Sequence, residues 1–282
     1  MSKFLFVGNR KFVLEEMIKL NLDVDILVIK NTHLEKDDLL KNYKHTIISS
    51  KEELLNYINK KDFDIFLSNG CPFILPIKHL KKKTYVNIHP SFLPDLKGID
   101  PCLGSILFSR DCGATCHHIN EVIDGGDIIS RVKIPFSKDL DVSLMYQLSF
   151  IAEKEVFHEA FKANFLIRKK QEVGDWIYYS RKEDDKKINF NENPNQLIQR
   201  IKTFNNKSQG CTFKNNNNIF KVYEASQINN IYVVNYSKNF KNLEIMFVYE
   251  DCVVFKKDEV VIKLSKVSGP LNTLKVKNKI NS

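Results

Sequence analysis

The stretch "NIHPSFLPDLKG", Asn87 to Gly98, places an amide and an imidazole two residues apart at the end of an apolar, β-branched run. Side chains alternate along a strand, so Asn87 and His89 are expected on the same face. A carboxamide can donate to a carbonyl oxygen that becomes an oxyanion, and an imidazole can take or relay the proton of an attacking amine. These two residue types fit transfer of an acyl group to an amine.

Asp124 supplies a third group for this chemistry, in the glycine-rich segment "EVIDGGDII" (Glu121 to Ile129). A carboxylate there can orient the imidazole of His89 or hold it protonated. Taken alone, His89 can also be a strand-end histidine bonded to a backbone carbonyl, and Asp124 can be a turn carboxylate. Together the three residue types fit transfer of a one-carbon acyl group to an amine without a covalent nucleophile.

The elements that would position these residues alternate between strand-like and helical patterns. Strands are expected at residues 3–7, 24–29, 45–48, 64–68 and 84–89, and helical patterns begin at Lys11 and Ser50. This order predicts an α/β fold with a doubly wound, Rossmann-like, mostly parallel sheet. Ligands bind beyond the carboxyl ends of the strands in such sheets. The opening stretch, "SNGCPFILP" and "EVIDGGDII" are therefore expected to converge there.

The second half of the chain differs from the first in its composition and in the elements that it predicts. Two strands around a glycine-rich loop are expected in residues 113–134, followed by a long helix over 142–168. Asn then becomes abundant, and the short runs "IFKVYEA", "IYVVNY", "EIMFVYEDCVVF" and "VVIKLSKV" read as strands, with "NNNN" as a hairpin turn. We predict a catalytic domain over residues 1–175 and a smaller β-rich domain over residues 176–282.

Composition limits the class of protein. The 282 residues are 43% hydrophobic and 27% charged, and no apolar run approaches the roughly 18 residues of a membrane span. The first residues lack the pattern of a signal peptide, so we expect a cytoplasmic protein with no membrane partner. The six cysteines are expected to be free thiols.

The net charge of +9 suggests nucleic-acid binding at first sight. More than half of the excess lies in residues 256–282, where seven lysines face two acidic residues. We interpret this stretch as a solvated end and predict no nucleic-acid partner, because no aromatic-basic repeat accompanies the lysines.

The words "NIHPSFLPDLKG", "GATCHHINEVIDGGDII" and "GCPFILP" resemble the formyltransferase family that uses 10-formyltetrahydrofolate, in order and spacing over residues 1–168. The resemblance implies that Asn87, His89 and Asp124 are the catalytic residues and that 10-formyltetrahydrofolate is the co-substrate. It also implies a pterin pocket, for which an apolar slot bent by two prolines is suited. The residues implied in this pocket are Phe73, Ile74, Leu75, Val122, Ile123, Gly125 and Asp127.

Departures from the family pattern bear on the acceptor. Methionyl-tRNA formyltransferases typically have a basic "LPRWRG", whereas this chain has "LPDLKG" with Asp95, which does not favour a polyanion. Glycinamide ribonucleotide formyltransferases usually end after the first domain. The words "LPDLKGIDP", "GATCHHI" and "RIKTFNNKSQG" (Arg200 to Gly210) look most like the sugar-nucleotide N-formyltransferases.

This resemblance implies an acceptor that is a dTDP- or UDP-linked amino-dideoxy sugar, used in surface polysaccharide or O-antigen synthesis, and a homodimer. The alternative is a methionyl-tRNA formyltransferase. The residues expected to contact the sugar nucleotide are Asn9, Arg10, Lys97 and His118. Either His117 or His118 is expected to face the cleft.

Three further features of the sequence allow other interpretations. A metal site in "CGATCHH" is disfavoured, because residues four apart on a strand lie roughly 13 Å from each other and cannot share one zinc ion. A non-catalytic dinucleotide-binding module is disfavoured, because "FVGNRKF" lacks the second and third glycines of the phosphate-binding fingerprint. Trp176, Tyr178 and Tyr179 can either stack on a base or pack a linker between domains.

Overall fold

The computed structural model describes residues 2–205 and 209–280, and these residues divide into two compact units. The first unit contains the chain up to Pro101 together with Asp111–Pro135 and Tyr146–Tyr179. The second contains Cys102–Arg110, Phe136–Met145 and the chain from Ser180 onward. The second unit therefore draws on two internal segments as well as on the C-terminal part. The division at residues 175/176 stays a prediction.

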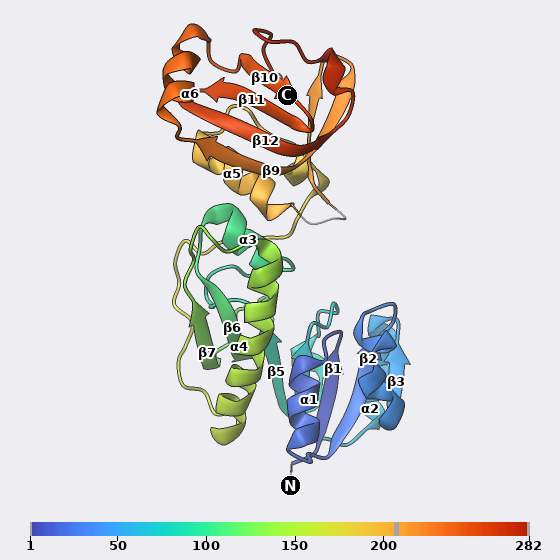
Figure 1. The fold of residues 1–282 in the computed structure, drawn as a ribbon. Helices are drawn as coiled ribbons and strands as arrows, with labels where there is room; N and C mark the ends of the chain where they lie inside the picture. Colours follow the sequence, from blue (N-terminus) through green and yellow to red (C-terminus); the bar gives the residue numbers. More distant parts are fainter. Residues whose placement is uncertain (1, 206–208, 281–282) are drawn as a thin grey trace. The chain divides into compact units, whose positions relative to one another are not determined.

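A seven-stranded sheet forms the centre of the first unit, in the order β3-β2-β1-β4-β5-β6-β7 (Figure 1). Strands β1 to β5 are parallel, and β6 and β7 continue the sheet in antiparallel fashion. The strands are β1 Phe4–Gly8, β2 Val24–Ile29, β3 His45–Ile48, β4 Ile65–Asn69, β5 Thr84–His89, β6 Cys112–His118 and β7 Ile128–Ile134. The predicted mostly parallel, Rossmann-like sheet is confirmed.

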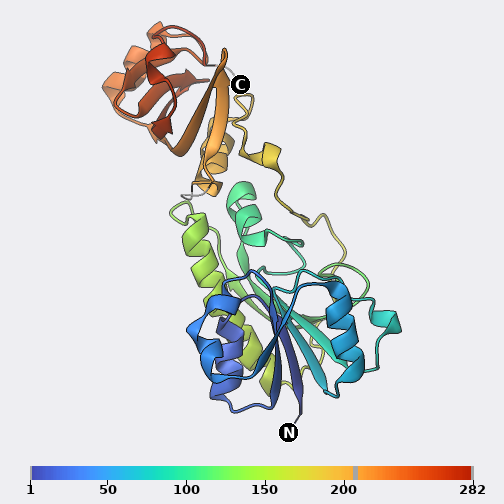
Figure 2. The same cartoon turned by 90° about the vertical axis from the view of Figure 1, so that its right-hand side faces the viewer.

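Helices cover both faces of this sheet (Figure 2). They are α1 Phe12–Lys19, α2 Lys51–Lys60 and the long α4 Val142–Lys162, while α3 Pro101–Phe108 follows β5. Ser50 begins α2 as expected, since its hydroxyl accepts the N–H of Glu53 at 3.2 Å. Short 3₁₀ helices lie at Leu34–Lys36, Asp38–Asn42 and Ile77–His79.

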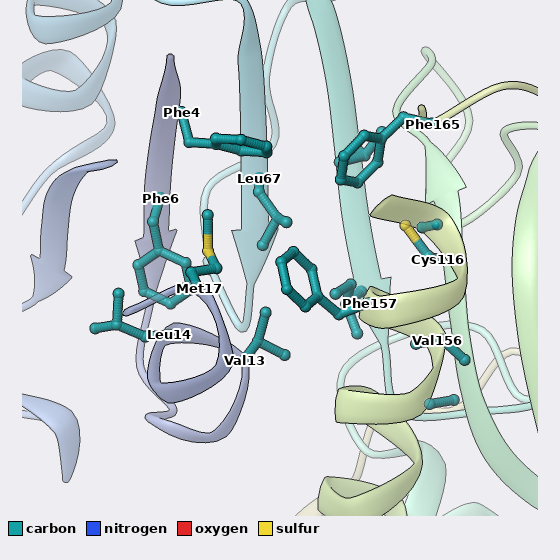
Figure 3. Packing of buried hydrophobic residues seen from close by; sticks show 14 of the residues in the cluster. Phe4, Phe6, Val13, Leu14, Met17, Leu67, Cys116, Val156, Phe157 and Phe165 are labelled. Atoms are coloured by element: carbon teal, nitrogen blue, oxygen red, sulfur yellow. The ribbon is translucent and has the colours of Figure 1, made fainter. Parts of the chain in front are cut away.

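Two hydrophobic cores hold the helices to the sheet. Helices α1 and α4 share one face, where Met17 of α1 and Phe157 of α4 are fully buried with Phe6 of β1 (Figure 3). Helix α2 covers the other face through Leu54 and Ile58. Because the central strands are buried on both faces, their sequences are nearly continuous hydrophobic runs, as parallel strands require.

The second unit contains an antiparallel five-stranded sheet in the order β10-β11-β12-β9-β8. Its strands are β8 Cys211–Asn215, β9 Asn218–Ile228, β10 Ile245–Tyr249, β11 Cys252–Lys257 and β12 Val260–Ser268. Its helices are α5 Pro194–Thr203 and α6 Ile231–Tyr236, with 3₁₀ helices at Glu183–Lys186, Ser237–Asn239 and Leu271–Thr273. The predicted smaller β-rich C-terminal part is confirmed.

Two local expectations for this unit are wrong and one holds. "IYVVNY" forms helix α6, because the side chain of Asn230 accepts the N–H groups of Tyr232 and Val233 and so caps a helix. The basic stretch that begins at Lys256 is not a solvated end as a whole, since it runs through β11 and β12 before the exposed Lys275, Lys277 and Lys279. The "NNNN" segment is a hairpin turn, with Asn216 at a φ of 56°.

Candidate active site

A cavity of about 360 Å³ lies in the first unit, beside the carboxyl ends of β1, β4 and β5. The segment after β4, the stretch "NIHPSFLPDLKG" that begins at Asn87 and the loop between β6 and β7 all contribute to its lining, so the three expected segments do converge. The turn after β1 lines the cavity as well. Ten of the predicted site residues line it: Asn9, Arg10, Phe73, Ile74, Leu75, Asn87, His89, Val122, Ile123 and Asp124. Two hollows of about 640 and 840 Å³ lie elsewhere, and neither is lined by the Asn87–His89–Asp124 group.

His89 is buried at the end of β5, with one ring nitrogen toward a carbonyl and the other toward a carboxylate. Its Nε2 lies 3.0 Å from the oxygen of Leu96, and its Nδ1 lies 3.5 Å from Oδ1 of Asp124. A carbonyl oxygen only accepts, so these partners assign the hydrogen to Nε2. A second proton on Nδ1 would place the imidazolium directly against the carboxylate of Asp124. The pair is therefore suited to take up and return a proton.

His117 of β6 lies opposite Asn87 in the sheet, and its ring orients the amide. Nδ1 of His117 donates to the oxygen of His118 at 2.8 Å, which leaves Nε2 to accept from Nδ2 of Asn87 at 3.3 Å. Burial lowers the pKa of His117 to about 4, so the ring is neutral near pH 7 and keeps this lone pair. One N–H of the Asn87 amide remains for a ligand oxygen.

Asp124 sits in a strained but well-supported loop. Its φ is 49°, a left-handed conformation that aspartate tolerates better than most residues. Its Oδ2 accepts the N–H of Gly98 at 2.9 Å, while the side-chain amide of Gln171 donates to the backbone oxygens of Asp124 and Gly126 at 2.8 and 2.7 Å. Gly98 thus holds the carboxylate and Gln171 holds the backbone of its loop, while Oδ1 of Asp124 lies 3.5 Å from Nδ1 of His89 and 3.7 Å from Nε2 of His117.

The end of the stretch "NIHPSFLPDLKG", at Gly98, and the next residue, Ile99, form another wall of the cavity. Oδ1 of Asp95 accepts the N–H groups of Leu96 and Ile177, each at 3.0 Å, and residues 97 and 178 form a parallel bridge. Gly98 has a φ of 102°, and a Cβ there would lie 2.6 Å from the oxygen of Tyr179, so only glycine fits. This pairing brings the exposed ring of Tyr178 to the cavity, whereas Tyr179 is buried.

Four predicted site residues do not line the cavity. They are Lys97, His118, Gly125 and Asp127, none of which is among its lining residues. Nε2 of His118 instead lies 3.1 Å from the oxygen of Phe165, and the backbone of Asp127 accepts the N–H of His118. Gly125 and Asp127 belong to the loop that carries Asp124, so their contribution is to its backbone.

Sequence reasoning left open whether His117 or His118 faces the site, and it missed Gln171. His117 could have been identified from the antiparallel register of β5 and β6, because paired residues on adjacent strands share a face. Gln171 gave no signal, since it lies beyond α4 and reaches the loop only in the folded chain. Among residues 2–205 and 209–280, no group of three or more His, Cys, Asp or Glu side chains is arranged to hold a metal ion.

Further observations concern thiols and membranes. All six cysteines are free, as expected. Burial raises the pKa of Cys71, which lines the cavity, to about 11, so this thiol is a poor nucleophile at neutral pH. Within the part of the chain that the structure describes, none of the helices combines the length and apolar character that a membrane crossing requires.

Comparison with known proteins gives matches at two levels. Residues 28–161 match the family model described as formyl transferase. The methionyl-tRNA formyltransferase of Rickettsia africae is 26% identical over 183 residues, a match that covers 63% of this chain and 60% of that protein. The chain thus matches about three fifths of the length of this curated relative.

Solved structures match over more of the chain. An N-formyltransferase from Helicobacter canadensis, in complex with folinic acid and dTDP-3-aminofucose, aligns with a TM-score of 0.72 at 20% identity, over 94% of this chain and 99% of that one. WlaRD, a sugar 3N-formyl transferase, aligns with a TM-score of 0.70 at 21% identity, over 94% and 97%. At these identities the likeness shows a shared fold. Residues 28–161 thus form a region that is similar to the formyl transferase family.

Proposed function

We propose that the protein transfers a formyl group from 10-formyltetrahydrofolate to the amino group of a dTDP- or UDP-linked amino-dideoxy sugar. The observation that carries the proposal is the group formed by Asn87, His89, His117 and Asp124 inside one cavity. It combines a free amide donor with a buried imidazole and carboxylate, which are the groups that formyl transfer to an amine requires. The opposite wall, Phe73 to Leu75, offers the apolar slot that a pterin needs.

In the proposed mechanism the sugar amine, as the free base, attacks the formyl carbon and forms a tetrahedral intermediate. The free N–H of Asn87 donates to the oxyanion, with its amide held by His117. His89, with Asp124 beside Nδ1, accepts the proton of the amine directly or through water and returns it to the departing nitrogen of tetrahydrofolate. The bond between the formyl carbon and the folate nitrogen then breaks, and the bond between the formyl carbon and the sugar nitrogen remains. Alignment of the two reactants supplies much of the rate acceleration.

Two observations support a sugar nucleotide as the acceptor. The Helicobacter canadensis protein, which was crystallised with dTDP-3-aminofucose, shares its fold with this chain through both units. The carboxylate of Asp95, where tRNA-specific relatives are expected to have a basic residue, is occupied by backbone N–H groups of this chain. Of the word "RIKTFNNKSQG", which also suggested this acceptor, residues 206–208 lie outside the described residues.

Methionyl-tRNA is the second candidate acceptor, since the Rickettsia africae protein that resembles this chain in sequence is named for that reaction. The net charge of +9 is compatible with it. A role in surface polysaccharide synthesis and a homodimer rest on the resemblance of the sequence alone, and a cytoplasmic location rests on the pattern of the first residues. Size-exclusion chromatography with light scattering tests the dimer.

The deciding experiment is a spectrophotometric assay of tetrahydrofolate release from 10-formyltetrahydrofolate. The acceptors are a panel of dTDP- and UDP-amino sugars, glycinamide ribonucleotide and methionyl-tRNA, assayed in parallel. Turnover with an amino sugar alone supports the proposal. Turnover with methionyl-tRNA alone replaces the acceptor, and no turnover with any acceptor by folded protein contradicts formyl transfer to these amines.

A further inference from the structure

A buried ion pair lies at the β1 side of the cavity and has no part in the mechanism above. Glu153 of α4 is fully buried and accepts two hydrogen bonds from Arg10, from Nε at 3.2 Å and from Nη2 at 2.8 Å. Arg10 lies in the turn between β1 and α1, and its side chain is 19% exposed. The pair joins the cavity rim to the long helix behind the sheet.

Burying a carboxylate this completely is costly unless its charge is compensated. Burial raises the pKa of Glu153, while Arg10 and a hydrogen bond from the side chain of Asn69 act against that rise. Among the described residues, Arg10 is the one cation that forms an ion pair with Glu153. A solvated surface position for Arg10 would cost less, so its location needs a reason.

The geometry of the guanidinium suggests that reason. Glu153 occupies the Nε–Nη2 edge, which leaves the Nη1–Nη2 edge for another partner. Nη1 has no hydrogen bond to any residue that the structure describes, and it lies 2.8 Å from where a Cβ on Gly70 would be. Both Arg10 and Gly70 line the cavity. A guanidinium edge of this kind matches the spacing of two oxygens of a phosphate or carboxylate.

We propose that Glu153 is a positioning residue that holds Arg10 so that its free edge faces the cavity and binds an oxyanion of a ligand. This inference rests on the proposed function, which offers two sources of such an oxyanion, the diphosphate of the sugar nucleotide and the glutamyl carboxylate of the folate. A fixed guanidinium loses less side-chain entropy on binding than a free one. Glu153 thus acts on ligand affinity and not on the chemical step.

The matched control is Glu16 of α1, which also joins α1 to α4, through His158 at 2.9 Å. It does not line the cavity. The variants are therefore E153Q, R10Q, the double variant R10Q/E153Q and E16Q. Each is titrated by calorimetry with dTDP, UDP and folinic acid, and kcat and KM are measured with any acceptor that the wild-type protein uses.

We expect E153Q to weaken binding of one probe about tenfold, the effect of losing roughly one charge-assisted hydrogen bond. R10Q should weaken the same probe, and the double variant should bind no worse than R10Q, because Glu153 acts through Arg10. E16Q should bind like the wild type even if it is less stable. In kinetics, KM for that substrate should rise while kcat is retained.

Each outcome decides between the alternatives. A loss confined to dTDP or UDP assigns the diphosphate, and a loss confined to folinic acid assigns the glutamyl carboxylate. Unchanged binding in folded E153Q, or an equal loss in E16Q, overturns the inference and leaves the proposed function intact. If E153Q does not fold, R10Q that binds all probes normally overturns the inference by itself. Wild-type protein that binds none of the probes contradicts the proposed function as well.

Discussion

Buried polar side chains are found in both units, but they bond over different distances along the chain. In the second unit, the hydroxyl of Thr203 donates to the oxygen of Gln199, and that of Ser237 donates to the oxygen of Val234. In the first unit, His117 contacts Asn87, and Arg10 contacts Glu153, which lies 143 residues away in sequence. Local bonds satisfy a group within its own element, whereas long-range bonds fix side chains from different elements around a cavity. The comparison supports placing the proposed chemistry in the first unit, while the second unit depends on apolar packing, as the cores of the first unit also do.

The largest expected effect tests the apolar packing of the second unit. Phe255 is fully buried, with its ring 5.7 Å from that of Phe190. Phe255→Ala should lower the free energy of unfolding by about 3–5 kcal/mol, through lost burial and the cavity left behind. Chemical denaturation measures the change, with Phe255→Leu as the milder control. Folinic acid binding below the unfolding transition should be unchanged, and its loss would show that this unit contributes to the site.

The next prediction concerns the amide in the first unit. Asn87→Ala removes the proposed oxyanion donor and should lower kcat about 100- to 1,000-fold, as loss of such a donor does in other enzymes. Asn218→Ala is the matched control, because Asn218 bonds Thr273 on an exposed hairpin of the second unit. Circular dichroism checks that both variants fold. An Asn87→Ala protein with near-normal turnover would remove the amide from the mechanism.

A smaller effect is expected from the pH dependence of stability. The pKa of His117 is about 4 in the folded protein and about 6.5 in an unfolded chain, so the unfolded state binds more protons between these values. Stability should therefore fall as the pH is lowered from about 6.5 to about 4, by more than about 1 kcal/mol. His117→Gln should flatten this part of the curve. Denaturation at several pH values gives the difference between the two proteins, and parallel curves would contradict the assignment.

The smallest effect is expected at the surface of the second unit. Asp184 and Lys187 form an ion pair at 2.8 Å with both side chains exposed. Exposed pairs of this kind contribute little, because water and salt screen them. Asp184→Asn should leave the thermal midpoint within error of the wild type, in contrast to disruption of the buried Arg10–Glu153 pair. A clear drop in the midpoint would mean that exposure alone does not separate the two kinds of pair.

Much of the first unit follows from local patterns in the sequence. Three of the five strands expected before residue 90 have the bounds that periodicity gave, and the other two differ by one residue. The helix over 142–168 ends earlier than expected, at Lys162. In the second unit, the prediction of a strand at "IYVVNY" is wrong. β-branched and aromatic residues favour strands, but the N-cap at Asn230 stabilises a helix there.

The sequence by itself determined the order of the elements and the presence of Asn87, His89 and Asp124 at strand and loop positions, because side-chain periodicity and glycine-rich turns are local properties. Only the tertiary structure decided that His117 and not His118 faces the cavity, that Gln171 supports the Asp124 loop, and that Glu153 holds Arg10. These contacts depend on strand register and on helices that pack far from their neighbours in sequence. No local pattern encodes them, since they exist only when distant segments are brought together.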